Sequence, residues 1–541
     1  MSMNFKRHYP ILILVTVVLS LLAFVLGKQR VIAYTTENDE SEQSLPTSGY
    51  DVSNSIDIFD DSTIHSVQVI MSEGDYDQML STYQETGLKD YFHADVIIDG
   101  VRVNNVGIRL KGNASLRSAL GGNMNPGGMR QGDFVGGRPD LGEFPQMPEA
   151  GQRPDLGERP QPPQDLQPPA ADQENDDNGQ LQPELDEQAG DQQGIFPAPG
   201  KGGFPDMNRL GQNDGEVKIP IMIKFDEFES GQTYQGYTAL AVRTYGASYD
   251  EALLEEPITN QIANLVGLPA TQTAYTGFKI NDDEEKLYVI SELVNQVYLD
   301  ENFENNNGVL YKAELGSTLN FKGEDPSSYA DSFTQQTRKN DADLLPLISF
   351  MRFLEETDDQ AFEEELPVWL DLDSFALYLA VNAMVVNTDS MIGMNNNFYL
   401  YYDDVSSQFT VLMWDANESF GKLGGSTTYD ISLSDVPTAF PEGRMGGRGG
   451  MGGGQNVLIS RFLGNTTFRS LYEEKLRLVY EQVFQSDYLD TLVNQYSDLI
   501  HSVNEERSLV DLDAYDQAVA DFLSFIAQRK EYLGSQTLLT E

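Results

Sequence analysis

Alternating hydrophobic and polar residues mark several short segments of the chain as β-strands. Such alternation places one side of each strand against a core and the other side toward solvent. Polar turns separate some of these segments, namely Asp99-Gly100, Asn281-Asp282-Asp283 and Asp403-Asp404. The pattern predicts strands over 65–71, 92–101, 106–111, 218–225, 271–280, 286–292, 397–402 and 409–414.

A helical period replaces the alternation elsewhere, with hydrophobic residues recurring every three or four positions. One of these segments has Ser248 or Asp250 as a candidate N-cap and Gly267 as its end. The pattern predicts helices over 75–86 and 249–266, a mostly helical block over 342–386 and two long helices over 468–534. Strands and helices in this mixed order predict an α+β fold.

The N-terminus has the pattern of a membrane-targeting segment. Lys6 and Arg7 precede an uninterrupted apolar run over 11–27, which as a helix spans roughly 25 Å. Lys28-Gln29-Arg30 follow this run directly, which favours an uncleaved signal anchor over 1–30; a cleaved signal peptide is the alternative. Both interpretations place the remainder outside the cytoplasm, anchored to the membrane or, after cleavage, secreted.

Two stretches of the chain show neither period. Residues 31–62 are polar and acidic and are predicted to be a tether. Residues 119–216 are rich in Pro, Gln, Gly and Asp, so they can bury too little apolar area to offset chain entropy, and we predict a disordered insertion. One domain is therefore predicted over 63–118 and 217–480, followed by a helical extension over 481–541.

Composition narrows the possible chemistry. With 85 acidic and 35 basic residues the formal net charge is −50, which argues against nucleic acid as a partner. The chain has no cysteine, so disulfides, thiolate metal sites and cysteine nucleophiles are excluded. Its four histidines are far apart in the sequence, which excludes an HExxH zinc site and argues against a Ser-His-Asp hydrolase.

The order of the predicted elements is that of a protein-kinase-like catalytic domain. A strand ending in Lys224 is followed by a helix with acidic residues, a linker strand and a helical block. Asp389 comes next, then three asparagines at 395–397, and then a hairpin that leads into Asp415. Glu292, at the end of the linker strand, is assigned no catalytic role.

The candidate polar residues suit phosphoryl transfer, which depends on aligning a nucleotide, its metal and an acceptor hydroxyl. Asp415 and Asn397 offer the oxygen ligands that Mg²⁺ prefers, and Mn²⁺ is the alternative metal. Asp389 lies on a polar loop, where its carboxylate can orient a Ser, Thr or Tyr hydroxyl of a protein substrate. Both aspartates have the alternative role of ordinary turn residues.

Basic residues are the candidates for binding ATP. Lys224 is predicted to contact the α- and β-phosphates and to pair with a glutamate of the following helix. The candidates for this pairing are Glu251, Glu255 and Glu256, and we favour Glu255. Arg109 and Lys111 share one face of a strand and are predicted to form a cationic pocket. Simple exposure to solvent is the alternative for each of these cations.

Several short motifs resemble those of the CotH-type spore coat kinase family. They lie between about residue 65 and residue 480, apart from the insertion, and the last two are the most specific. The motifs are Val106-Gly107-Ile108-Arg109-Leu110-Lys111-Gly112-Asn113-Ala114-Ser115, Gly267-Leu268-Pro269-Ala270, the strand into Glu292, Gly308-Val309-Leu310-Tyr311-Lys312, Asn387-x-Asp389, Asn397-Phe398-Tyr399-Leu400-Tyr401 and Trp414-Asp415-x-Asn417-x-Ser419-Phe420-Gly421.

The resemblance implies a two-lobed, atypical protein-kinase-like fold that uses ATP and a divalent metal to phosphorylate proteins, notably those of spore coats. The chain departs from the family's Trp-Asp-x-Asp pattern at Asn417, where the second oxygen ligand is neutral. Two alternatives remain open. One is a non-catalytic surface or spore-coat module with the same fold, and the other is transfer of a different group from ATP, such as AMP.

Overall fold

The computed structural model describes residues 55–112, 218–244, 251–341, 343–422, 429–433 and 456–540, together with residues 116 and 120. The predicted signal anchor over 1–30, nearly all of the predicted insertion over 119–216 and the candidate N-caps Ser248 and Asp250 lie outside these residues. Within the described part of the chain, no helix is both long enough and apolar enough to cross a membrane.

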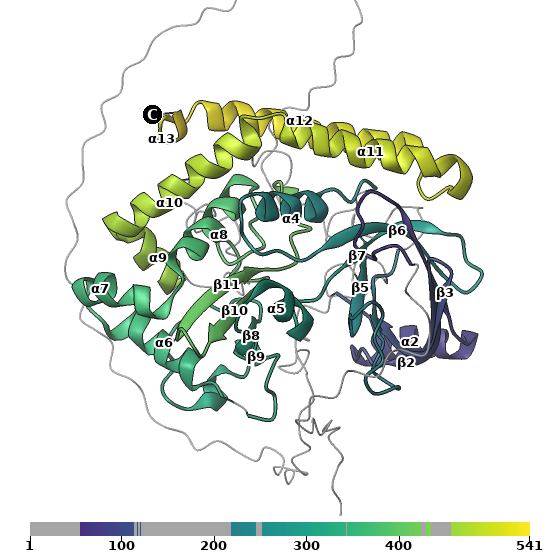
Figure 1. Ribbon diagram of the computed structural model, residues 1–541, viewed down its shortest axis with the longest axis horizontal. Coiled ribbons are helices and arrows are strands. Elements are labelled where there is room, and N and C mark those ends of the chain that lie inside the picture. Colours follow the sequence, from purple (N-terminus) through teal and green to yellow (C-terminus); the bar gives the residue numbers. More distant parts are fainter. Residues whose placement is uncertain are drawn as a thin grey trace, which may run out of the picture. The chain divides into compact units, whose positions relative to one another are not determined.

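Seven strands close into a barrel in the order β1-β2-β3-β4-β5-β7-β6 (Figure 1). Neighbouring strands are antiparallel except β1 and β6, which pair in parallel. The α+β class is confirmed, and the small sheet expected of a kinase-like fold is found to be a closed barrel. The strands are β1 (His65–Ile70), β2 (Phe92–Ile98), β3 (Val101–Leu110), β4 (Ile221–Lys224), β5 (Ala239–Arg243), β6 (Thr273–Ile280) and β7 (Lys286–Ser291).

A second, antiparallel sheet has the strand order β11-β10-β8-β9. One face of this sheet belongs to the largest hydrophobic core. On the other face, Tyr399, Leu412 and Trp414 form a smaller cluster with helix α5 (Gln296–Asn302). The strands are β8 (Val309–Ala313), β9 (Phe333–Gln335), β10 (Phe398–Asp403) and β11 (Gln408–Met413).

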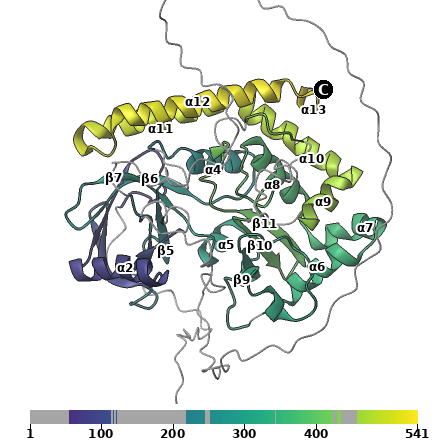
Figure 2. The ribbon, with the colours of Figure 1, turned by 180° about the vertical axis from the view of Figure 1, so that it is seen from behind.

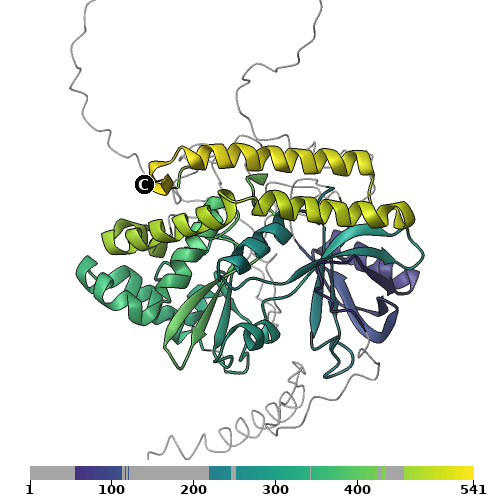
Figure 3. The ribbon, with the colours of Figure 1, turned by 45° about the horizontal axis from the view of Figure 1, so that its top comes forward.

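Helices supply most of the largest core, and α8 and α10 lie side by side in it (Figure 2). The helices are α2 (Glu73–Thr86), α4 (Glu255–Leu265), α6 (Leu345–Glu356), α7 (Asp359–Trp369), α8 (Leu372–Met384), α9 (Val457–Gly464), α10 (Thr466–Val479), α11 (Tyr488–Arg507), α12 (Leu512–Gly534) and α13 (Thr537–Thr540), with a 3₁₀ turn η1 (Pro326–Tyr329) and a π-helical turn η4 (Tyr480–Phe484). The two long helices predicted over 468–534 are therefore three, of which α11 and α12 run alongside each other (Figure 3).

Three boundaries differ from those predicted. Ile58 and Phe59, assigned to the tether, are buried in the barrel core, because this short apolar pair packs against the strands. The helix predicted from residue 249 begins at Glu255. The helices after residue 480, predicted to be an extension, share the largest core with α8.

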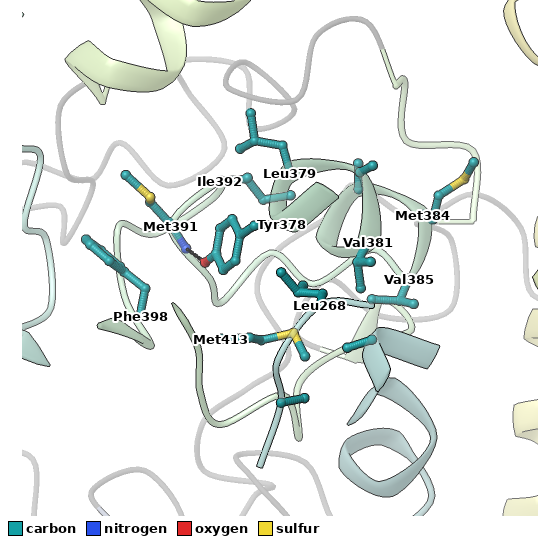
Figure 4. Close-up of a cluster of buried hydrophobic side chains, with 14 of the residues drawn as sticks. Leu268, Tyr378, Leu379, Val381, Met384, Val385, Met391, Ile392, Phe398 and Met413 are labelled. Atoms are coloured by element: carbon teal, nitrogen blue, oxygen red, sulfur yellow. Dashed lines mark hydrogen bonds between the residues drawn. The ribbon is translucent and has the colours of Figure 1, made fainter. Parts of the chain in front are cut away.

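The largest core also anchors the polar loop between α8 and β10. Figure 4 shows Tyr378 and Leu379 of α8 beside Met391 and Ile392 of that loop and Phe398 of β10. The Met391 amide donates a hydrogen bond to the Tyr378 hydroxyl at 3.3 Å. A loop of polar residues is in this way held at a defined position by buried apolar neighbours.

Candidate functional site

Polar residues from the barrel, from α4 and from the second sheet meet around the turn that follows β11. Arg243, the last residue of β5, contacts the carboxylate of Asp415 in this turn. The Nε of Arg243 also pairs with Glu256 of α4 at 3.0 Å, and these two side chains are only 7% and 5% exposed. One guanidinium therefore connects three separate elements, of which the turn after β11 lies 172 residues from Arg243 in the sequence.

The remaining nitrogen of this guanidinium lacks an acceptor. Among the described residues, Arg243 Nη1 is buried and has no hydrogen-bond partner. Buried N–H groups in native proteins are nearly always paired, because leaving one unpaired costs free energy. The geometry at Arg243 therefore indicates that a ligand or water supplies the acceptor.

Other cations surround the same position. Lys111 Nζ lies 4.9 Å from the ring centroid of Trp414, and the Arg243 guanidinium lies 5.4 Å from it. Burial lowers the pKa of Lys111 well below its usual value, and the charges of Arg243, Lys312 and Arg109 lower it further. Cations from β3, β5 and β8 thus converge in a chain whose net charge is −50, and an anion bound among them would relieve their repulsion.

Asp389 lies in the loop between α8 and β10, next to this group. The side-chain amides of Asn396 and Asn397 donate hydrogen bonds to its two oxygens at 3.0 and 2.9 Å. The Asn397 nitrogen also lies 3.5 Å from the main-chain oxygen of Asp415. Burial raises the pKa of Asp389 to about 6, and the two amides offset only part of this effect. A carboxyl group that titrates near neutral pH is therefore held beside Asp415.

The loops carrying Asp389 and Asp415 are joined through the main chain. The amide of Phe420 donates to the Val385 oxygen at 2.5 Å, and the amide of Gly421 donates to the Val386 oxygen at 3.3 Å. Asn387 donates from its side chain to Asn382 of α8 at 2.9 Å. These bonds fix the two aspartates relative to each other.

The donor set fits a magnesium ion that is shared with a phosphate. Groups of three or more His, Cys, Asp or Glu able to hold a metal are absent from the described residues. Magnesium commonly uses only one or two protein ligands and completes its shell with phosphate oxygens and water. Asp415 offers a carboxylate, and Asn397 uses its nitrogen toward Asp389, which leaves its amide oxygen as the ligand atom. Asn417 is partly buried in the same turn.

A family model described as CotH kinase protein matches residues 216–533. The chain belongs to this family. The inner spore coat protein H of Bacillus subtilis (strain 168) is 20% identical over 313 residues, which cover 57% of this chain and 80% of the relative. Among solved structures, the Helicobacter pylori proinflammatory kinase CtkA matches with a TM-score of 0.21 and 13% identity, over 54% of this chain and 94% of that one.

In this CotH family member, most of the predicted site residues come together. Asp389, Asn397 and Asp415 are linked by hydrogen bonds, and Lys111 lies over the neighbouring Trp414 ring. Arg109 lies farther out: its guanidinium is 5.1 Å from the ring centroid of Tyr91, although its charge still acts on Lys111. The roles assigned to these residues stay predictions.

The predicted pairing of Lys224 with Glu255 is wrong. Lys224 pairs instead with Glu227 at 2.8 Å and with Asp226 at 3.8 Å, because the chain turns directly after β4 and brings these carboxylates to the end of the same strand. Glu255 pairs with Lys422 at 2.7 Å. Glu256, one of the two other candidates, is the helix glutamate that pairs with a strand cation, and that cation is Arg243.

Sequence reasoning missed Arg243 and assigned no role to Lys312. All five positions of β5 are buried, so the strand shows no alternation of the kind used to find the others. The available signal was a short apolar run that ends in an arginine, Ala239-Leu240-Ala241-Val242-Arg243. Lys312 lay within a motif of the family, but its position opposite Tyr399 depends on the pairing of β8 with β10.

Proposed function

We propose that this CotH family member is a phosphotransferase that uses ATP with Mg²⁺ or Mn²⁺ to phosphorylate a Ser, Thr or Tyr hydroxyl of a protein. The observation that carries this proposal is the buried Nη1 of Arg243, which has no partner among the described residues and lies among converging cations and beside Asp415. The phosphates of ATP offer acceptors for this N–H, and membership of a family described as kinases favours ATP as their source.

The site residues divide into three roles under this proposal. The phosphates are bound by Lys111 and Arg243 of the barrel and by Lys312 of the second sheet. In a two-lobed fold, the barrel and the second sheet would belong to different lobes. Asp415 and Asn397 hold the metal, which when bound neutralises charge on the phosphates. Asp389 accepts a hydrogen bond from the acceptor hydroxyl and takes up its proton, a task that suits a carboxylate with a pKa near 6.

We further propose that the acceptor is a protein of a spore coat or cell surface, outside the cytoplasm. The predicted signal segment over 1–30 supports export. The relative that matches over 313 residues is named as an inner spore coat protein, which supports a coat location. Attachment to the membrane through the N-terminal segment is part of the same proposal.

The direct test incubates the full-length protein with γ-labelled ATP, Mg²⁺ or Mn²⁺ and casein as a general acceptor. We expect labelling by the wild type and a loss of roughly 10²- to 10⁴-fold in the Asp389→Ala variant, because such losses follow removal of a general base. The Asp389→Asn variant keeps the size of the side chain and should lose as much. Equal labelling by all three proteins would overturn the assignment, and label from α-labelled ATP alone would indicate AMP transfer.

The neutral Asn417 favours a second candidate, a non-catalytic coat or surface module. Thermal unfolding with Mg·ATP distinguishes the two. A ligand present at 100 times its Kd stabilises the folded state by about 2.7 kcal/mol, which is readily detected. No shift at millimolar Mg·ATP would favour the module. The Asn417→Asp variant restores the family's second carboxylate and should increase the response to the metal.

A further inference from the structure

Arg529, in α12, is a fully buried cation whose hydrogen bonds to the described residues all go to the main chain. Its side chain makes no ion pair among the described residues. Its donors reach four carbonyl oxygens, from Nε to Met384 at 3.1 Å, from Nη2 to Ala383 at 2.8 Å, and from Nη1 to Tyr429 at 2.7 Å and to Ile431 at 3.0 Å. Four of the five guanidinium N–H donors are thus used on main-chain oxygens, which indicates a role in holding the backbone.

Two of these carbonyls belong to the last turn of α8. Carbonyl groups at the end of a helix have no amide partner within it, and a cation there also interacts favourably with the helix dipole. Burial lowers the pKa of Arg529 to about 10, so the side chain stays charged at neutral pH. Because α8 leads directly into the loop with Asp389, Arg529 fixes the point at which that loop begins.

The turn after α8 is strained and depends on its surroundings. Val386 has a φ of 53°, a left-handed conformation that β-branched residues rarely adopt. Arg529 holds the helix end before this residue. On its other side, the amides of Phe420 and Gly421 bind the oxygens of Val385 and Val386. The strained turn is therefore held from two directions.

Helix α12 also contacts the second of these supports. The ring of Phe420 packs against Phe522 at 4.7 Å and Phe525 at 6.4 Å between centroids. Phe420 itself has a φ of 54° and lies five residues after Asp415. A single C-terminal helix thus contacts both the start of the Asp389 loop and the segment that follows Asp415.

We propose that Arg529 is a positioning residue for phosphoryl transfer, which acts by fixing Asp389 relative to Asp415. The expected effect on kcat rests on the proposed function, whereas the expected effect on the loop does not. The proposal assigns a role in catalysis to α12. Among the described residues, the hydrogen bonds of Arg529 go to main-chain oxygens and not to Arg243, Glu256 or Asp415. A change at Arg529 should therefore alter the alignment of the aspartates and leave phosphate binding in place.

The test uses the full-length Arg529→Lys variant, which keeps the charge but loses the planar fork that reaches several carbonyls. We expect kcat to fall roughly 10- to 100-fold, as a small misplacement of reacting groups does, with a change of less than about threefold in KM for Mg·ATP. Amide hydrogen exchange over 385–397 and 416–421 should become faster.

Arg507→Lys is the matched control. Arg507 of α11 also donates to main-chain oxygens, those of Ile64 and His65, and pairs with Glu285, but it holds the barrel instead of the catalytic loop. This variant should leave kcat and exchange over 385–397 unchanged. Equal effects of the two variants, or unchanged kcat or loop exchange in Arg529→Lys, would overturn the inference. If the wild type transfers no phosphate, the proposed function fails and loop exchange alone decides the positioning role.

Discussion

Arg243 of strand β5 in the barrel and Arg529 of helix α12 are both buried, yet their N–H donors have different kinds of partner. Within the described part of the chain, Arg243 is shared between two carboxylates and has one nitrogen without a partner. The hydrogen bonds of Arg529 to these same residues all go to main-chain oxygens. A buried guanidinium with one nitrogen unpaired therefore indicates a ligand, whereas one in which every nitrogen donates to a main-chain oxygen indicates that backbone is being held in place.

Exchanging each arginine for lysine tests this contrast most strongly. Arg243→Lys should lower kcat/KM for ATP by roughly 100-fold, because one preorganised donor to the phosphates is typically worth that much. It should also abolish most of the thermal stabilisation by Mg·ATP. The comparison is Arg529→Lys, in which that stabilisation should persist. If both variants raise KM for Mg·ATP alike, the two arginines do not differ in the way described.

Asp389, in the loop that follows helix α8, should set the pH dependence of the proposed reaction. Under the proposed function Asp389 must be ionised to accept the hydroxyl proton, and burial raises its pKa to about 6. Below that pH, kcat should therefore fall about tenfold for each unit, and above it kcat should level off. Steady-state rates between pH 4.5 and 8 measure this directly. A flat profile through pH 6 would separate Asp389 from the rate-limiting step.

The same carboxyl group should reduce stability at neutral pH. Its pKa is higher in the folded chain, about 6, than the ordinary value of 3.8, so folding favours its protonated form. Its ionisation therefore costs stability as the pH rises from about 4 to 6, and the full cost of roughly 3 kcal/mol is present above pH 6.

Asp389→Asn should accordingly stabilise the protein at pH 7.5 by about 1 to 3 kcal/mol, since the amide avoids the buried charge but binds Asn396 and Asn397 less well. The gain should disappear below pH 4, where the wild-type carboxyl is protonated. Urea unfolding at both pH values measures it, and an equal gain at both would contradict the assigned cause.

The smallest effect on kinetics is expected at Lys224, which ends β4 of the barrel that also carries Arg243. Its partners are the local carboxylates Asp226 and Glu227, and its side chain is 36% exposed. Lys224→Met should therefore change kcat/KM for ATP by less than about threefold. Lys111→Met, which removes a cation beside Trp414, is the matched substitution and should cost at least about tenfold. Equal losses of kcat/KM in the two variants would indicate that Lys224 also binds the phosphates.

The loops that carry Asp389 and Asp415 were predictable because their signals are local. Asp389 and Asp415 lie in short motifs next to a helix and a hairpin whose hydrophobic patterns are clear, and the hairpin formed where its turn residues indicated. The start of α4 was harder to predict, because Leu254 occupies the N-cap and makes no side-chain capping bond. That uncertainty is one reason why Glu255 was favoured, whereas the glutamate that pairs with a strand cation is Glu256.

The amino-acid sequence alone was enough to predict the alternating strands, the amphipathic helices, the polar loops and the family. Two contacts became visible only in the folded chain: Arg243 faces Asp415, 172 residues away, and Arg529 reaches Met384 of α8, 145 residues away. Hydrophobic periodicity depends on neighbouring residues and survives in the sequence. Ion pairs and hydrogen bonds depend on distances of a few ångströms between residues that only folding brings together.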